Sequence, residues 1–122
     1  MGPMDIDIYG IPNCDTMKKA RAWLAAHGVA HTFHDYKKEG VDRALLDRWC
    51  DAAGWEALLN RRGTTWRRLA EAEREGVDRE RAVALMAANP SLIRRPVLMM
   101  GDTIEIGFSE ERYRAMLGAI LA

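Results

Sequence analysis

The sequence predicts an α/β fold in which a mixed four-stranded sheet is covered by helices. A β-like run, a helix and a second β-like run come first, and such a crossover unit makes two parallel strands. A strand–turn–strand pattern and a final helix close the chain. Between the two units lies a block of helical patterns, expected as an insertion at about 42–89. The length of 122 residues fits one domain over 1–122.

The first third of the chain carries the crossover unit. A β-like run over 6–9 is bounded by a glycine and a proline. The helix after it can be capped by Asp15 or Thr16 and stops at Gly28, because apolar residues recur at helical spacing between them. The second strand is expected over 30–36.

The helical block follows a polar turn, KKEG. Asp42 can cap its first helix, and Gly54 ends that helix. A short helix is expected in WEALLN, directly after this glycine.

Two further helices complete the block. The pattern TWRRLAEAEREG predicts one helix, capped by Thr64 or Thr65. The pattern DRERAVALMAANP predicts another, which stops at Asn89 and Pro90.

The C-terminal unit is a hairpin followed by a helix. Strands are expected at Val97–Met100 and Thr103–Ile106, joined by the turn dipeptide Gly101-Asp102. Ser109 can cap the last helix. That helix has a one-sided apolar stripe made of Tyr113, Met116, Leu117, Ile120 and Leu121.

Composition limits the function classes. The charges balance, with 18 basic and 18 acidic side chains, which argues against direct, nonspecific binding to nucleic acid or anionic membranes. No apolar run approaches the roughly 20 residues that span a bilayer, and no signal peptide is seen. We therefore expect a cytoplasmic monomer, and we take residues 1–3 as a remnant of cloning. The 2 cysteines lie too far apart for a disulfide scaffold or a zinc site, so no metal is expected.

Cys14 is the first candidate for chemistry. It lies in the turn before the first helix, where free backbone N–H groups and the helix dipole favour negative charge. A thiolate is the reactive form of cysteine, and this position can lower its pKa from about 8.5. The alternative is a small residue that fills a tight turn. The position favours the functional interpretation.

A partner thiol for Cys14 is absent nearby. A dithiol motif would carry its second cysteine three residues on, where the sequence has Met17. Cys50 lies on the apolar stripe of its helix, so a buried, inert cysteine is expected there. A redox cycle must use an outside thiol, or Cys50 if the fold brings it near.

Arginines are the second candidate group. Their guanidinium forks suit carboxylates, phosphates and other oxyanions. Arg94 and Arg95 directly precede Pro96, and a cis bond at an X-Pro step would present the preceding backbone to a ligand. Only about 5–6% of X-Pro bonds are cis, so the dipeptide alone is weak evidence.

Taken together, these motifs resemble a known family. IYGIPNCDTMKKARAWL, NRRGTTWRRL and PSLIRRPVLMMGDTIEIGFSEE are similar to the ArsC/Spx family of thioredoxin-like proteins, in its YffB-like, arsenate reductase-like branch. The resemblance runs from about residue 5 to the C-terminus. It implies a thioredoxin-like fold with an inserted helical block, and a cis Pro96 next to the thiol of Cys14.

The resemblance also implies a set of site residues. Cys14 would be the nucleophile, and Arg95 and Arg62 would hold an anionic group. The residues expected to contact substrate or glutathione are Asn13, Asp15, Thr16, Arg95 and Pro96. No permanently bound cofactor is implied; glutathione would act as co-substrate, with glutaredoxin as a further partner in arsenate reductases of this type.

One arginine of the arsenate reductases has no counterpart here. The matching position falls near Gly107, and Glu105 nearby would repel an oxyanion. The leading hypothesis is therefore a glutathione-dependent thiol–disulfide oxidoreductase with one nucleophilic cysteine, and arsenate reduction coupled to glutathione and glutaredoxin is the alternative. A third hypothesis is an Spx-like regulator that binds RNA polymerase, although Met17 removes the two-cysteine switch of that branch.

Overall fold

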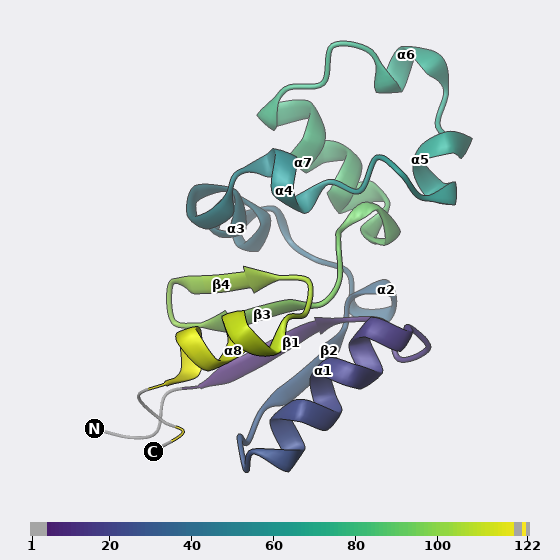
Figure 1. Cartoon of the computed structure of the whole chain (residues 1–122). Coiled ribbons are helices and arrows are strands. Elements are labelled where there is room, and N and C mark those ends of the chain that lie inside the picture. The colour runs from purple at the N-terminus through teal and green to yellow at the C-terminus, as the bar shows by residue number, and fades with distance from the viewer. Residues whose placement is uncertain (1–4, 119–120, 122) are drawn as a thin grey trace.

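A mixed four-stranded sheet forms the centre of the protein. The computed structural model describes residues 5–118 and 121, so the expectations for residues 1–3 and Ile120 lie outside the described residues. The strands are β1 (Ile6–Gly10), β2 (Thr32–Asp35), β3 (Val97–Met100) and β4 (Thr103–Ile106). Their order across the sheet is β2-β1-β3-β4 (Figure 1). β1 pairs parallel with β2 and antiparallel with β3, and β3 pairs antiparallel with β4. The predicted α/β class and mixed sheet are confirmed.

Two helices cover one face of the sheet. These are α1 (Asp15–Ala26) and α8 (Glu110–Leu117), which lie on the same side of the strands in Figure 1. Side chains alternate along β1, so that Ile6 and Ile8 point to this face. Ile8 is fully buried and lies opposite Phe33 and Leu98 in the register of the sheet.

The helical block lies on the side of the other face. It consists of α3 (Arg43–Ala53), α4 (Trp55–Leu58), α5 (Thr64–Arg68), α6 (Glu71–Arg74) and α7 (Arg79–Ala88), with α2 (Tyr36–Glu39) before it and η1 (Pro90–Leu92) after it. Of these helices, α2 and α3 contact the strands. Tyr9, Val97 and Ile104 belong to the hydrophobic cluster on this side, together with the fully buried Trp49 of α3. None of the helices within 5–118 is both long and apolar enough to cross a membrane.

Backbone contacts join the helical block to the segment that enters β3. Leu59 forms an isolated antiparallel bridge with Ile93. The amide of Asn60 donates to the carbonyl of Leu92 at 2.8 Å, and the amide of Arg94 donates to the carbonyl of Leu58 at 2.8 Å. The path of residues 93–96 is therefore determined by α4 as well as by the sheet.

Most predicted helix ends are confirmed, and the exceptions have local causes. The carboxylate of Asp42 and the hydroxyl of Ser109 accept amide hydrogen bonds at the starts of α3 and α8, and α3 ends at Gly54. The prediction that Asp15 or Thr16 caps α1 was wrong, because Cys14 occupies the cap position. The expected KKEG turn is the short helix α2, because Asp35 accepts from the amides of its first turn.

The single helix expected in TWRRLAEAEREG is wrong. The segment forms α5 and α6, and α5 begins after Gly63 instead of being capped by Thr64 or Thr65. The backbone at Leu69 and Ala70 is extended, and the amide of Ala70 donates to the Glu73 carboxylate at 3.0 Å. This side-chain bond supplies a new helix start in the middle of the segment.

Replacement of two buried tyrosines by phenylalanine should have opposite effects on the free energy of unfolding. Tyr113 and Tyr36 are both fully buried. The Tyr113 hydroxyl has no hydrogen-bond partner among the residues that the structure describes, whereas that of Tyr36 donates to the Ile93 carbonyl at 2.7 Å. An unpaired buried polar group costs about 1–3 kcal/mol. Tyr113→Phe should therefore raise the free energy of unfolding by about 1 kcal/mol, and Tyr36→Phe should lower it by a similar amount. Urea unfolding of both variants tests this; a loss of stability in Tyr113→Phe would contradict it.

Candidate active site

Cys14 is the residue from which α1 begins. Its backbone is extended, with φ −102° and ψ 128°, and its carbonyl accepts the first hydrogen bond of the helix from Lys18 at 2.9 Å. Its side chain is half-buried and makes no capping hydrogen bond. The thiol thus occupies the place where Ser or Asp usually caps a helix, beside amides that have no partner in the helix.

Arg95 lies beside the thiol and is held by Tyr36. The guanidinium Nη1 lies 3.4 Å from the Tyr36 hydroxyl and 3.4 Å from the Ser91 carbonyl oxygen. Its positive charge also lowers the pKa of the Cys14 thiol. The Arg95–Pro96 peptide bond is cis. The structure thus places Arg95, and the cis bond that joins it to Pro96, where the guanidinium acts on Cys14.

The surroundings of Cys14 favour its thiolate. Burial by itself raises the pKa of the thiol, but the amides of Met17 and Thr16 and the guanidinium of Arg95 stabilise the negative charge. These three groups outweigh burial, so the pKa of Cys14 lies below that of an ordinary thiol. A larger thiolate fraction at neutral pH means faster attack on electrophiles.

No second thiol of the chain lies near Cys14. Met17 is fully buried in the cluster between α1 and the sheet. Cys50 is buried in the cluster on the opposite face, and burial raises its pKa. Both cysteines are free. Cys50 therefore fits the inert core cysteine expected from the sequence.

The other expected site residues are placed differently. Asn13, Asp15 and Thr16 are exposed around Cys14, at the start of α1. Arg62 is exposed in the loop between α4 and α5, where its amide donates to the Asn60 side chain at 3.0 Å. No hydrogen bond or ion pair within the described part of the chain connects Arg62 with Cys14.

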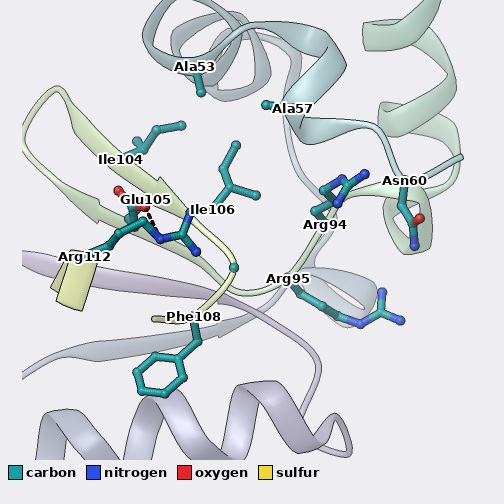
Figure 2. Close-up of a pocket in the computed structure, with 11 residues that line it drawn as sticks. Ala53, Ala57, Asn60, Arg94, Arg95, Ile104, Glu105, Ile106, Phe108 and Arg112 are labelled. Atoms are coloured by element: carbon teal, nitrogen blue, oxygen red, sulfur yellow. Dashed lines mark ion pairs between the residues drawn. The ribbon is translucent and has the colours of Figure 1, made fainter. Parts of the chain in front are cut away.

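A cleft opens next to Arg95, between the helical block and β4. It has a volume of about 710 Å³. Figure 2 shows that the side chains of Arg94 and Arg95 diverge, with Arg94 directed toward the helical block. The lining residues are Ala53, Ala57, Asn60, Arg94, Arg95, Ile104, Glu105, Ile106, Gly107, Phe108 and Arg112. No group of three or more potential metal ligands occurs among the described residues.

Comparison with protein-family models identifies the family of this chain. The model of the ArsC family matches residues 9–116. The chain belongs to the ArsC family. Its α/β fold with a mixed four-stranded sheet is the thioredoxin-like fold that the resemblance implied.

Relatives in the ArsC family carry different names. The solved structure of a protein called YffB (PA3664) has a TM-score of 0.87 and 52% identity, covering 90% of this chain and 96% of that one. A protein from Brucella melitensis described as related to arsenate reductase has a TM-score of 0.73 and 53% identity, covering 94% and 96%. The global transcriptional regulator Spx of Streptococcus pyogenes is 31% identical, over 92% of this chain and 84% of its own.

Arg112 is a residue of the cleft that the sequence did not suggest. Its Nε lies 3.1 Å from the Glu105 carboxylate, and its Nη2 would lie 3.6 Å from a Cβ added at Gly107. The guanidinium of Arg112 thus lies near Gly107, where the arginine of the arsenate reductases is missing from the sequence. It reaches this position from α8. Side chains in a helix lean toward its N-terminus. The Ser109 cap, which places residue 112 in the first turn of α8, was the signal that could have indicated this.

Proposed function

We propose that this ArsC-family protein is a glutathione-dependent thiol–disulfide oxidoreductase with a single nucleophilic cysteine. The observation that carries the proposal is the environment of Cys14: its pKa is lowered by two amides and Arg95, and Met17 and Cys50 offer it no partner thiol. An activated thiol without an internal partner suits a cycle whose second thiol comes from solution.

The reaction balances with glutathione as the reductant. The Cys14 thiolate attacks the glutathione sulfur of a mixed disulfide, which forms a Cys14–glutathione disulfide and releases the other half as a thiolate. That thiolate takes up a proton. A second glutathione, having lost its proton, attacks the glutathione sulfur bound to Cys14. This step frees the Cys14 thiolate and yields glutathione disulfide. The net exchange converts the mixed disulfide and one glutathione thiol into the released thiol and glutathione disulfide.

The residues around Cys14 suit a peptide-like thiol. The carbonyl of Pro96 accepts from the amide of Gly107 at 2.8 Å, whereas Arg95 makes no backbone–backbone hydrogen bond with the described residues. The Arg95 main chain can therefore pair with an extended ligand, and its guanidinium can hold a carboxylate. We assign Asn13, Asp15 and Thr16 as exposed contacts beside the thiol. The role that the resemblance implied for Arg62 gains no support from its described contacts.

Trapping of the mixed disulfide tests the proposal. Oxidised glutathione should add one glutathione to Cys14 within the folded protein, and excess reduced glutathione should remove it. Mass spectrometry of peptides from the Cys50→Ala variant locates the adduct without interference from the second cysteine. Failure to form the adduct on the folded protein, or an adduct that reduced glutathione does not remove, would contradict the proposal.

Arsenate reduction is the second candidate. It is favoured by the relative from Brucella melitensis that is described as related to arsenate reductase, and by the guanidinium of Arg112 beside Gly107. Glu105 opposes it, because its carboxylate lies 3.1 Å from Arg112 Nε and repels a doubly charged arsenate. An assay with arsenate, glutathione and glutaredoxin decides: a Cys14-dependent rate above background supports arsenate reduction, and its absence removes this candidate.

A regulatory role is the third candidate, favoured by the name of the Spx relatives. Such a role would not need Cys14 chemistry. Stoichiometric recovery of RNA polymerase subunits with the tagged protein, unchanged in Cys14→Ser, would support it; their absence would count against it.

A further inference from the structure

The cleft beside Arg95 carries more positive than negative charge. Its lining contains three arginines and one carboxylate, which leaves two positive charges in excess. Arg95, which the proposed function assigns to a carboxylate of glutathione, also donates a hydrogen bond to the Tyr36 hydroxyl. Arg94 and Arg112 are exposed and remain available for a ligand.

Arg94 has a fixed main chain and a free guanidinium. Its amide is bonded to the Leu58 carbonyl at 2.8 Å, but its side chain has no ion pair or hydrogen bond with the residues described. Figure 2 shows this side chain on the Asn60 side of the cleft. Asn60 adds an amide group to the same wall.

Arg112 faces the cleft from α8 with a weak internal partner. Its ion pair with Glu105 is marked in Figure 2, and the exposed fractions of the two side chains are 52% and 22%. An ion pair with this much solvent contributes little to stability, so a ligand carboxylate can compete for the guanidinium at small cost.

We propose that Arg94 and Arg112 form a carboxylate subsite that selects acidic disulfides as substrates of Cys14. Glu105 holds Arg112 in place until a carboxylate of the substrate binds to it. The inference rests on the proposed function, since it names the class of disulfide that Cys14 would attack. The reaction is an ordinary thiol–disulfide exchange: the Cys14 thiolate forms a bond to one sulfur of the acidic disulfide, and the other sulfur leaves as a thiolate.

The walls and size of the cleft fit such a substrate. Ile104, Ile106 and Phe108 provide apolar surface between the charged groups. The volume of about 710 Å³ lies within the range of roughly 300–1,000 Å³ typical of small-molecule sites. Cys14 does not line the cleft, but Arg95 does and acts on the Cys14 thiol. A disulfide attacked by Cys14 can therefore extend a carboxylate-bearing arm past Arg95 into the cleft.

Paired chromogenic disulfides test the subsite. Dithiobis(nitrobenzoate) carries two carboxylates, and dithiodipyridine is neutral. The rate constant of Cys14 with each, measured in a Cys50→Ala background, gives an anionic-to-neutral ratio that cancels changes in the thiol itself. Arg94→Gln and Arg112→Gln should each lower the ratio by about threefold to tenfold, and added salt should reduce the difference. Glu105→Gln should raise it.

Arg114→Gln is the matched control. Arg114 lies on the same helix as Arg112, but its guanidinium lies 5.8 Å from the ring centre of Trp23 and 3.4 Å from His27, outside the cleft. Its loss should leave the ratio within about twofold of the parent. Equal ratios in all variants, or an equal fall in Arg114→Gln, would overturn the subsite.

The two proposals fail in different ways. A slow rate with neutral dithiodipyridine, matching that of an ordinary thiol, would contradict an activated Cys14. The ratio would still report the effect of Arg94 and Arg112 in that case. A fast neutral reaction with an unchanged ratio would retain the proposed function and overturn the carboxylate subsite.

Discussion

Replacement of Cys14 by serine is expected to reduce glutathione-dependent disulfide reduction to the background rate. A serine hydroxyl is not ionised near neutral pH and cannot form the mixed disulfide. The fold and the binding of reduced glutathione should persist, because the Cys14 side chain makes no capping hydrogen bond that serine would break. A coupled turnover assay and calorimetric titration of the variant measure the two properties separately.

Cys50→Ala is the matched control for this experiment. Cys50 is buried in the cluster on the other face of the sheet, and burial raises the pKa of its thiol. Turnover in Cys50→Ala should stay within about twofold of the unmodified protein, with some loss of stability from the cavity. Activity that survives in Cys14→Ser but disappears in Cys50→Ala would contradict the assignment of the nucleophile.

Replacement of Arg95 by glutamine should raise the pKa of Cys14 and slow its reaction at neutral pH. Burial raises this pKa and the Met17 and Thr16 amides lower it; Arg95 is the one side chain that adds to the lowering. At a pH below the midpoint, each unit by which the pKa rises makes the thiolate fraction about tenfold smaller. At a pH well above both midpoints, both proteins are fully ionised, so the difference in rate that comes from the thiolate fraction should vanish there.

Arg94→Gln separates this effect from a general change of charge. Arg94 is the neighbouring arginine, but it is not one of the groups that chiefly determine the pKa of Cys14. Alkylation of single-cysteine proteins across a pH series measures both midpoints. A shift in Arg95→Gln alone supports the account; identical midpoints in the parent and Arg95→Gln would contradict it.

Local sequence patterns were sufficient to predict much of the fold. The hairpin of Val97–Met100 and Thr103–Ile106 has a turn dipeptide between two β-like runs, and Ser109 supplies the cap of the helix after it. These elements depend on neighbours a few residues away. Patterns of that kind can be read without knowledge of tertiary contacts.

Other elements depend on contacts that short patterns do not reveal. Tyr36 was expected to end the second strand, yet it begins α2 and is fully buried with its hydroxyl on the Ile93 carbonyl. The split at Leu69 and Ala70 depends on the side chain of Glu73. In both places a specific hydrogen bond outweighs the average preference of the segment.

The candidate site was predictable in part for the same reason. Cys14 could be singled out because its role depends on a helix start, which is a local feature. Its proximity to Arg95 follows from the sheet, and was expected only through the family resemblance. The position of Arg62 depends on the loop after α4, and Arg112 reaches the cleft from a separate helix. No spacing within the sequence relates these arginines to the cysteine.

The alkylation rate of Cys14 against pH, in Cys50→Ala with and without S-methylglutathione, tests the central claim most directly. S-methylglutathione keeps the carboxylates and peptide bonds of glutathione but cannot react with the alkylating reagent. The account predicts a midpoint below about 8.5 and slower alkylation when the ligand is present. A midpoint at the ordinary value, with no protection by the ligand, would contradict both the activated thiol and its glutathione site.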